Sequence, residues 1–216
     1  MDIKICGITC LDDARAASAL DIQAVGLVFY PKSPRFVDDA TARSIARALS
    51  SHIAAVGVFV DVPWEAVLAR ARSVGLHAVQ LHGHESPEDV ARLQDAGLRV
   101  IKALFINRAP LVEAHVRYAP SAFLVECAGA QRPGGNALAW DWRQARGAVK
   151  GAPMILAGGL SPENVEDAVR AAEPSGVDVS SGVESRPGRK DPEKMNRFVN
   201  AVRRLRPRLL QGGIFS

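Results

Sequence analysis

The sequence predicts a single (β/α)8 barrel that occupies residues 1–216, and three observations support this fold class. Short apolar runs alternate with helical stretches along the whole chain, several runs are apolar on both faces, and two turns rich in glycine and serine follow the last two runs. Continuously apolar strands are typical of parallel sheets covered on both sides. Phosphate-binding turns after the last two strands are typical of this barrel. No linker-like composition interrupts the alternation, so we expect one domain.

Eight strands are expected, which leaves roughly 27 residues for each strand, helix and pair of tight loops. The clearest strands are Ala24–Phe29 and Ala54–Val60, because neither contains a polar residue. The expected strands lie at residues 2–6, 24–29, 53–60, 77–82, 99–104, 122–126, 153–157 and 176–180.

Helices are expected between these strands because apolar residues recur there at the period of one helix face, as in Met195–Val202. A polar cap residue followed by proline is typical of a helix start. The expected starts are Ser86-Pro87, Ser161-Pro162 and Asp191-Pro192. The unit at residues 105–120 has room for only a short helix, because Pro110 and Pro120 restrict it. We expect residues 207–216 to form a frayed tail.

The composition indicates a soluble cytoplasmic protein that binds neither nucleic acid nor a membrane. Charged residues make up 23% of the chain, and there is no long apolar run or signal segment. The net charge of +4 suits a small anionic ligand, whereas the scattered arginines do not resemble a nucleic-acid surface. The cysteines are Cys6, Cys10 and Cys127, an odd number, and we expect reduced thiols.

Two residues that end expected strands could carry acid–base chemistry. Cys6 ends the first strand and Glu126 ends the sixth. The carboxyl ends of barrel strands surround one mouth, so the two groups would face the same ligand. A thiolate can act as a base or a nucleophile, and burial favours the neutral, proton-donating form of a carboxyl. The alternative for Cys6 is a small buried residue with no chemical role.

Two further side chains are candidates for ligand contact. Arg35 lies in a loop that prolines stiffen, so its guanidinium is presented at a defined place, although an ordinary surface arginine is the alternative. His82 and His84 follow the fourth strand and could share a metal ion, but no other ligand has matching spacing. We therefore expect no metal site, and interpret His82 as a pocket wall residue that touches the substrate.

Two turns near the end of the chain have the composition of a phosphate site. The first contains Gly158 and Gly159, and the second contains Ser180, Ser181 and Gly182. Small residues let backbone N–H groups approach an anion closely. The pair of turns, one strand–helix unit apart, predicts a bound phosphate at the mouth of the barrel.

Six ordered motifs together resemble the phosphoribosylanthranilate isomerase family. They are Lys4–Thr9, Gly26–Arg35, Val56–Val60, Val79–Gly83, Leu156–Leu160 and Asp178–Asp191. The resemblance implies a monomeric or homodimeric (β/α)8 barrel that needs no cofactor. It also implies an Amadori rearrangement of a small anionic phosphosugar, N-(5-phosphoribosyl)anthranilate, in the third step of tryptophan synthesis from anthranilate.

Roles for individual residues follow from this resemblance. Cys6 is similar to the general base that takes the proton from C2 of the sugar, and Arg35 to the residue that holds the anthranilate moiety. Asp178 is similar to the acidic residue beside the sugar. The phosphate cradle corresponds to Gly158, Gly159, Ser180, Ser181 and Gly182.

The chain departs from the family pattern at the general acid. The family has an aspartate where this chain has Glu126, and a Gly-Gly-Thr-Gly loop where this chain has Gly134-Gly135-Asn136-Ala137. We expect Glu126 to take the acid role from a stem that is longer by one methylene. Two alternatives are a phosphate-ligand binding barrel with weak or lost isomerase activity and an isomerase that also serves histidine synthesis. The Cys6 strand end argues against the second, because the histidine enzymes use a carboxylate pair.

Overall fold

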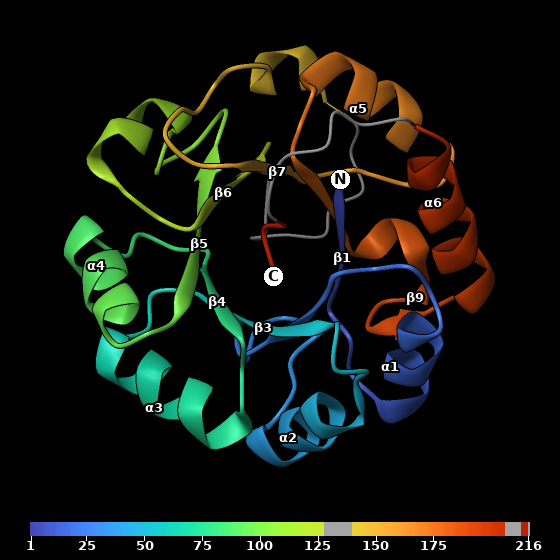
Figure 1. The fold of residues 1–216 in the computed structure, drawn as a ribbon, viewed down its shortest axis with the longest axis horizontal. Helices are drawn as coiled ribbons and strands as arrows, with labels where there is room; N and C mark the ends of the chain where they lie inside the picture. Colours follow the sequence, from blue (N-terminus) through green and yellow to red (C-terminus); the bar gives the residue numbers. More distant parts are fainter. Residues whose placement is uncertain (128–139, 206–212, 216) are drawn as a thin grey trace.

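Eight parallel strands close into a barrel in the computed structural model of the chain (Figure 1). The structure describes residues 1–127, 140–205 and 213–215. The first and last strands pair in parallel and close the cylinder, with Lys4 opposite Asp178. The fold class predicted from the sequence is confirmed.

Every strand of the barrel lies where the sequence predicted it, with each boundary within one residue. The strands of the barrel are β1 (Asp2–Cys6), β2 (Ala24–Val28), β3 (Ala54–Phe59), β4 (Ala78–Leu81), β5 (Arg99–Phe105), β6 (Ala122–Glu126), β7 (Met154–Leu156) and β8 (Gly176–Val179). The agreement is close because parallel strands covered by helices need apolar residues on both faces, and those runs end where the chain leaves the barrel.

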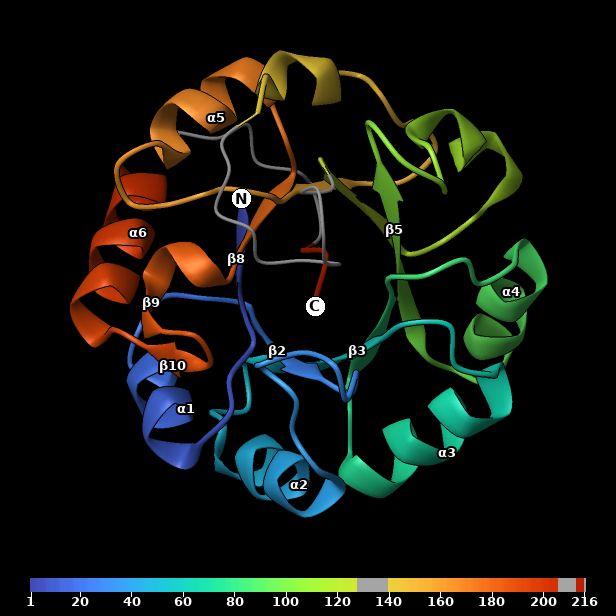
Figure 2. The same ribbon diagram turned by 180° about the vertical axis from the view of Figure 1, so that it is seen from behind.

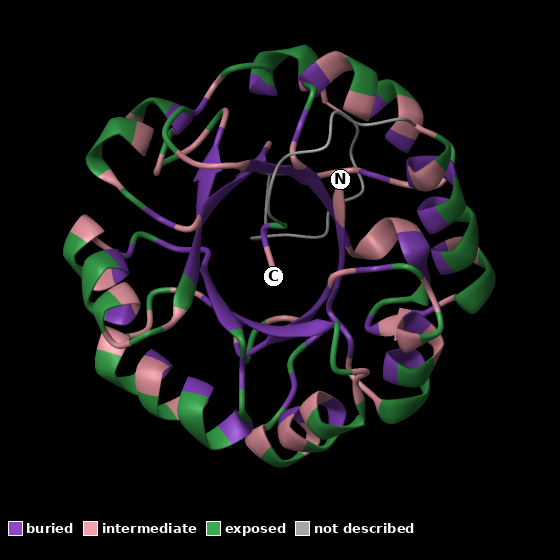
Figure 3. Ribbon diagram, viewed as in Figure 1, coloured by how far each residue is buried: buried purple, intermediate pink, exposed green. Residues whose placement is uncertain are grey.

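Helices surround the barrel (Figure 2), and their exposed residues lie on the outer side of the molecule (Figure 3). They are α1 (Leu11–Ser18), α2 (Asp39–Ala48), α3 (Trp64–Val74), α4 (Pro87–Asp95), α5 (Val165–Ala172) and α6 (Pro192–Arg204), with the 3₁₀ helices η1 (Val112–Arg117), η2 (Trp142–Ala145) and η3 (Ser181–Val183). A short antiparallel pair, β9 (Glu184–Arg186) and β10 (Arg189–Lys190), follows β8. The expected short helix within residues 105–120 is η1.

Two of the three predicted helix starts are confirmed. Ser86 forms a capping box at the start of α4, and the Asp191 side chain accepts from backbone N–H groups of the first turn of α6. The start predicted at Ser161-Pro162 is wrong, because α5 begins at Val165. The reason is the Asn164 side chain, which accepts from the Ser161 N–H and donates to the Gly159 carbonyl, each at 2.8 Å. These bonds hold residues 161–164 in a turn.

Small apolar residues fill the end of the barrel interior at which the strands begin. Ala24, Ala54, Ala78 and Ala122 form this layer with larger isoleucines. Ile214 packs against it, and its N–H donates to the Asp2 carboxylate at 2.6 Å. Residues 213–215 therefore differ from the expected frayed tail, since an apolar side chain near the C-terminus covers the open end of the cylinder.

No described helix is long and apolar enough to span a lipid bilayer.

Candidate active site

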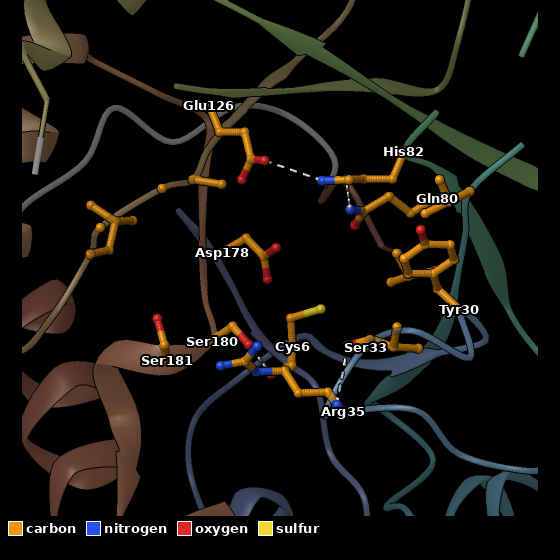
Figure 4. Close-up of a pocket in the computed structure, with 17 residues that line it drawn as sticks. Cys6, Tyr30, Ser33, Arg35, Gln80, His82, Glu126, Asp178, Ser180 and Ser181 are labelled. Atoms are coloured by element: carbon orange, nitrogen blue, oxygen red, sulfur yellow. Dashed lines mark hydrogen bonds and ion pairs between the residues drawn. The ribbon is translucent and has the colours of Figure 1, made fainter. Parts of the chain in front are cut away.

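One pocket opens at the end of the barrel where the strands finish (Figure 4). It contains about 700 Å³ of space, including its open mouth. The residues that line it come from most of the strands and from the turns that follow them. They are Cys6, Val28, Tyr30, Ser33, Arg35, Val58, Val60, Gln80, His82, Glu126, Ala157, Gly158, Gly159, Leu160, Asp178, Ser180 and Ser181. The topology thus gathers residues from both ends of the chain around one cavity.

On one side of the pocket lies the Cys6 thiol. Lys4 precedes it by two residues on β1 and therefore points to the same inner face of the strand. The Lys4 ammonium is completely buried and lies 3.0 Å from Asp178 Oδ1. Asp178 lines the pocket, whereas Lys4 lies below it. The thiol is thus close to both a buried cation and a buried carboxylate.

The two charges set the electrostatics of the thiol. Burial raises the pKa of Cys6 above its ordinary value of 9.0, and the positive charge of Lys4 opposes this shift. Burial alone would lower the pKa of Lys4, but Asp178 and Cys6 outweigh it, so the pKa of Lys4 lies above 10.5. Lys4 therefore stays positively charged and favours the thiolate.

Glu126 lies across the pocket from Cys6 (Figure 4). Its side chain is buried, and Oε1 is 3.2 Å from His82 Nε2. His82 Nδ1 is in turn 2.9 Å from the amide nitrogen of Gln80. His84, in contrast, is exposed and pairs with Asp61 at 3.4 Å. The two histidines thus point to different places, and within the described ranges no three His, Cys, Asp or Glu side chains gather as metal ligands would.

Arg35 reaches the pocket but is bound to the protein. Its Nε and Nη2 donate to the two carboxylate oxygens of Glu184, at 2.8 and 2.7 Å. Lys190 donates to the same carboxylate at 2.9 Å. Burial alone would raise the pKa of Glu184, but Arg35 and Lys190 hold it below 4.5. The guanidinium is therefore fixed in orientation, and its flat face remains for a planar ligand group.

The first predicted phosphate turn has a backbone that suits an anion. Gly158 and Gly159 both have positive φ, at 86° and 70°. The Trp140 indole donates to the carbonyls of Ala157 and Gly158, each at 3.2 Å, and Asn164 donates to that of Gly159. Because C=O and N–H point in opposite directions across a trans peptide, the N–H groups of Gly158 to Leu160 point away from these donors. These N–H groups are therefore not used by the same donors and remain available for an anion.

The second predicted turn lies against the first. Ser180 and Ser181 line the pocket, and the Ser180 hydroxyl donates to the Cys6 carbonyl at 3.0 Å. Gly182 does not line it. A side chain at Gly182 would collide with the carbonyl oxygen of Leu160, so the glycine lets the two turns pack together. The structure shows a packing role for Gly182, and its contact with a phosphate stays a prediction.

The sequence did not single out Lys4, Gln80 or Tyr30 as site residues. Lys4 and Gln80 each lie two residues before a predicted site residue on a strand, a spacing that places them on the same face. For both Lys4 and Gln80, a polar residue inside an otherwise apolar strand was the signal in the sequence that could have indicated a site residue. The Gly134–Ala137 loop lies outside the described residues.

A (β/α)8 barrel with one cavity at the carboxyl ends of its strands, lined by a thiol and carboxyl groups, has the architecture of the barrel enzymes, whose active sites lie at this end. The family model "N-(5'phosphoribosyl)anthranilate (PRA) isomerase" matches residues 3–201. The chain belongs to this family.

Individual relatives agree with the family model. A curated PRA isomerase of Desulfatibacillum aliphaticivorans is 52% identical over 199 residues, which cover 92% of this chain and 91% of the relative. The crystal structure of PRA isomerase from Thermotoga maritima matches with a TM-score of 0.86 and 36% identity, over 95% of this chain and 100% of that one. The Thermus thermophilus structure matches with a TM-score of 0.85 and 38% identity, over the same shares. A further PRA isomerase structure holds reduced 1-(o-carboxyphenylamino)-1-deoxyribulose 5-phosphate, an analogue of the product.

Proposed function

We propose that Cys6 and Glu126 are the base and the acid of the isomerisation that this protein performs. The protein converts N-(5-phosphoribosyl)anthranilate to 1-(2-carboxyphenylamino)-1-deoxyribulose 5-phosphate in tryptophan biosynthesis. The observation that supports the assignment is the position of a thiol and a carboxyl on opposite sides of one cavity, with the glycine turn on its rim.

In the first step Glu126 protonates the ring oxygen of the sugar. The C1–O bond breaks, its electron pair stays on the oxygen as a hydroxyl group, and the nitrogen lone pair forms a C1=N double bond. Glu126 is left as a carboxylate. The cationic nitrogen that results makes the neighbouring C2 proton more acidic.

In the second step the Cys6 thiolate removes the C2 proton. The C–H electron pair forms the C1=C2 bond, and the C1=N pair returns to nitrogen. The product of this step is an enolamine, which becomes the ketone when the C2 hydroxyl loses a proton and C1 gains one. Lys4 favours the thiolate that this step requires.

The ends of the substrate would be held by groups that do not react. The phosphate fits the N–H groups of Gly158 to Leu160 together with Ser181, and the anthranilate ring fits the face of the Arg35 guanidinium. Anchoring both ends positions the sugar carbons between Cys6 and Glu126. Because Glu184 already occupies two Arg35 donors, stacking contributes more than direct ion pairing at this end.

Cys6→Ser and Glu126→Ala test the assignment. Each should lower kcat by roughly 100- to 10,000-fold, because each removes one acid–base group. Each should bind the reduced product analogue within a few-fold of the unaltered protein in calorimetry. Full turnover in either variant would remove that residue from the mechanism. Parallel assays with the aminoaldose of histidine synthesis test whether the site accepts a second substrate.

The number of subunits is a separate proposal. One similar structure shows monomers made from a dimeric Thermotoga maritima enzyme. We expect a monomer or a homodimer, and sedimentation equilibrium distinguishes the two.

A further inference from the structure

Three buried polar side chains form a continuous chain along one wall of the pocket (Figure 4). Gln80 and His82 lie two residues apart and face the pocket from the end of β4, and Glu126 ends β6. Their exposed fractions are 2%, 6% and 5%. Gln80 Nε2 lies 2.9 Å from His82 Nδ1, and His82 Nε2 lies 3.2 Å from Glu126 Oε1.

The chemistry of these atoms determines where the histidine proton sits. An amide nitrogen only donates hydrogen bonds, so His82 Nδ1 must accept, and a neutral ring then carries its proton on Nε2. That proton points to Glu126. The ring itself is held by Phe105, whose plane it meets at 89° with centroids 5.4 Å apart. Gln80 thus sets the tautomer, and the packing sets the ring orientation.

This arrangement favours the charge that forms on Glu126 during the reaction. When the carboxyl gives its proton to the sugar, it becomes an anion, and the hydrogen bond from His82 becomes charge-assisted. Such bonds are stronger than those between neutral groups. An interaction that strengthens as the reaction proceeds accelerates it. The opposite tautomer would present a lone pair to Glu126 and repel the carboxylate.

The oxygen of the Gln80 amide has a different environment from the nitrogen. Gln80 Oε1 is buried and has no hydrogen-bond partner among the residues that the structure describes. A buried carbonyl oxygen without a partner is costly. Because Gln80 lines the pocket, a hydroxyl group of a bound sugar could donate to this oxygen.

We propose that Gln80 has two roles in the isomerisation: it positions the acid through His82, and it binds a sugar hydroxyl directly. The first role rests on the proposed function of Glu126. Gln80 is therefore a positioning residue for the chemical step through its nitrogen and a substrate-binding residue through its oxygen.

The test uses two variants of nearly equal shape. Gln80→Met removes the bond to His82 and the proposed bond to the sugar, and it should lower kcat roughly 10- to 100-fold and weaken binding of the reduced product analogue about tenfold. Gln80→Glu can only accept from His82, so the ring proton should move to Nδ1 or the ring should become charged. Gln144→Met, at an exposed position of η2, is the matched control and should leave all values unchanged.

Histidine-selective ¹⁵N NMR gives a readout that does not depend on turnover. The chain has 5 histidines, and the signal lost in His82→Asn assigns His82. The unaltered protein should show the proton on Nε2, and Gln80→Glu should show it on Nδ1. A proton on Nδ1 in the unaltered protein would overturn the positioning role.

The outcomes separate this inference from the proposed function. If Glu126→Ala is inactive while Gln80→Met keeps full kcat and analogue affinity, the roles of Gln80 are wrong and Glu126 remains the acid. If Glu126→Ala is fully active, the proposed acid is wrong and so is the positioning role. A loss of thermal stability in Gln80→Met with unchanged kcat and affinity would indicate a structural role alone and would contradict the proposal.

Discussion

Lys4 and Lys102 are both completely buried, and each pairs with a carboxylate, yet they lie on different sides of the barrel wall. Lys4 on β1 points inward and lies 3.0 Å from Asp178. Lys102 on β5 lies 2.8 Å from Glu85, and its ammonium also donates to the Gly83 carbonyl at 2.7 Å. The first pair adjoins the pocket, which Asp178 lines, whereas the second holds the segment after β4.

The surroundings of the two lysines give them opposite shifts. Burial lowers the pKa of Lys102 below its ordinary value of 10.5, although Glu85 opposes this shift. The pKa of Lys4 is raised, because Asp178 and the Cys6 sulfur together outweigh its burial. Two buried ion pairs of the same chemical type thus serve different purposes. Lys102 stabilises a loop, and Lys4 places a positive charge beside a reactive thiol.

The largest effect is expected from Lys4→Met, which removes the positive charge beside Cys6. Without the positive charge the Cys6 thiolate is less favoured, so kcat at neutral pH should fall roughly 100-fold. The alkylation rate of Cys6 by iodoacetamide, followed by mass spectrometry of its peptide, should rise only at higher pH than in the unaltered protein. An unchanged alkylation profile would show that Lys4 has no electrostatic role.

Lys102→Met is the matched control and carries a prediction of its own. Removing one partner of a buried ion pair should lower the free energy of unfolding by about 3 to 5 kcal/mol, because Glu85 is left buried without its cation. Denaturant unfolding measures this loss. The alkylation profile of Cys6 should stay unchanged, and a shift as large as that of Lys4→Met would remove the distinction between the two lysines.

The ionisation of Cys6 can also be followed directly as a function of pH. Because burial raises the pKa of Cys6 above 9.0, only a small fraction is thiolate at neutral pH. Below that pKa the thiolate fraction rises about tenfold for each pH unit. We expect the rate of Cys6 alkylation by iodoacetamide to rise between pH 6 and 9 in proportion to this fraction. An alkylation rate that stays flat over this range would contradict a raised pKa for Cys6.

The smallest effect concerns another buried carboxylate, Glu184, which has two cationic partners. Its pKa is lower in the folded state than the ordinary 4.5, because Arg35 and Lys190 outweigh its burial. Its stabilising contribution is therefore present above about pH 4.5 and lost as the pH falls through the folded-state pKa. The Tm should fall as the pH is lowered below about 4.5, and in Glu184→Gln it should fall less steeply. An equal dependence of Tm on pH in the two proteins would show that Glu184 is not the group responsible.

The sequence could predict the positions of the site residues but not their partners. Cys6 and Glu126 were recognisable because each ends an apolar run, and the glycines at 158 and 159 because they follow another. Arg35 was expected to be held at a defined place by its stiff loop, but its bond to Glu184, which lies 149 residues away, was not foreseen. Local patterns contain no information about a contact of that range.

By itself the sequence determined the number and boundaries of the barrel strands, and it placed Cys6, His82 and Glu126 at the mouth of the barrel. The physical reason is that hydrophobic period and turn composition act over a few residues. Only the tertiary structure decided that Lys4 meets Asp178 and that His82 meets Glu126. Those contacts depend on which strands the closed sheet places side by side and which it places across the interior. The alternation along a single strand determines the face on which a side chain lies, but not the residue opposite it.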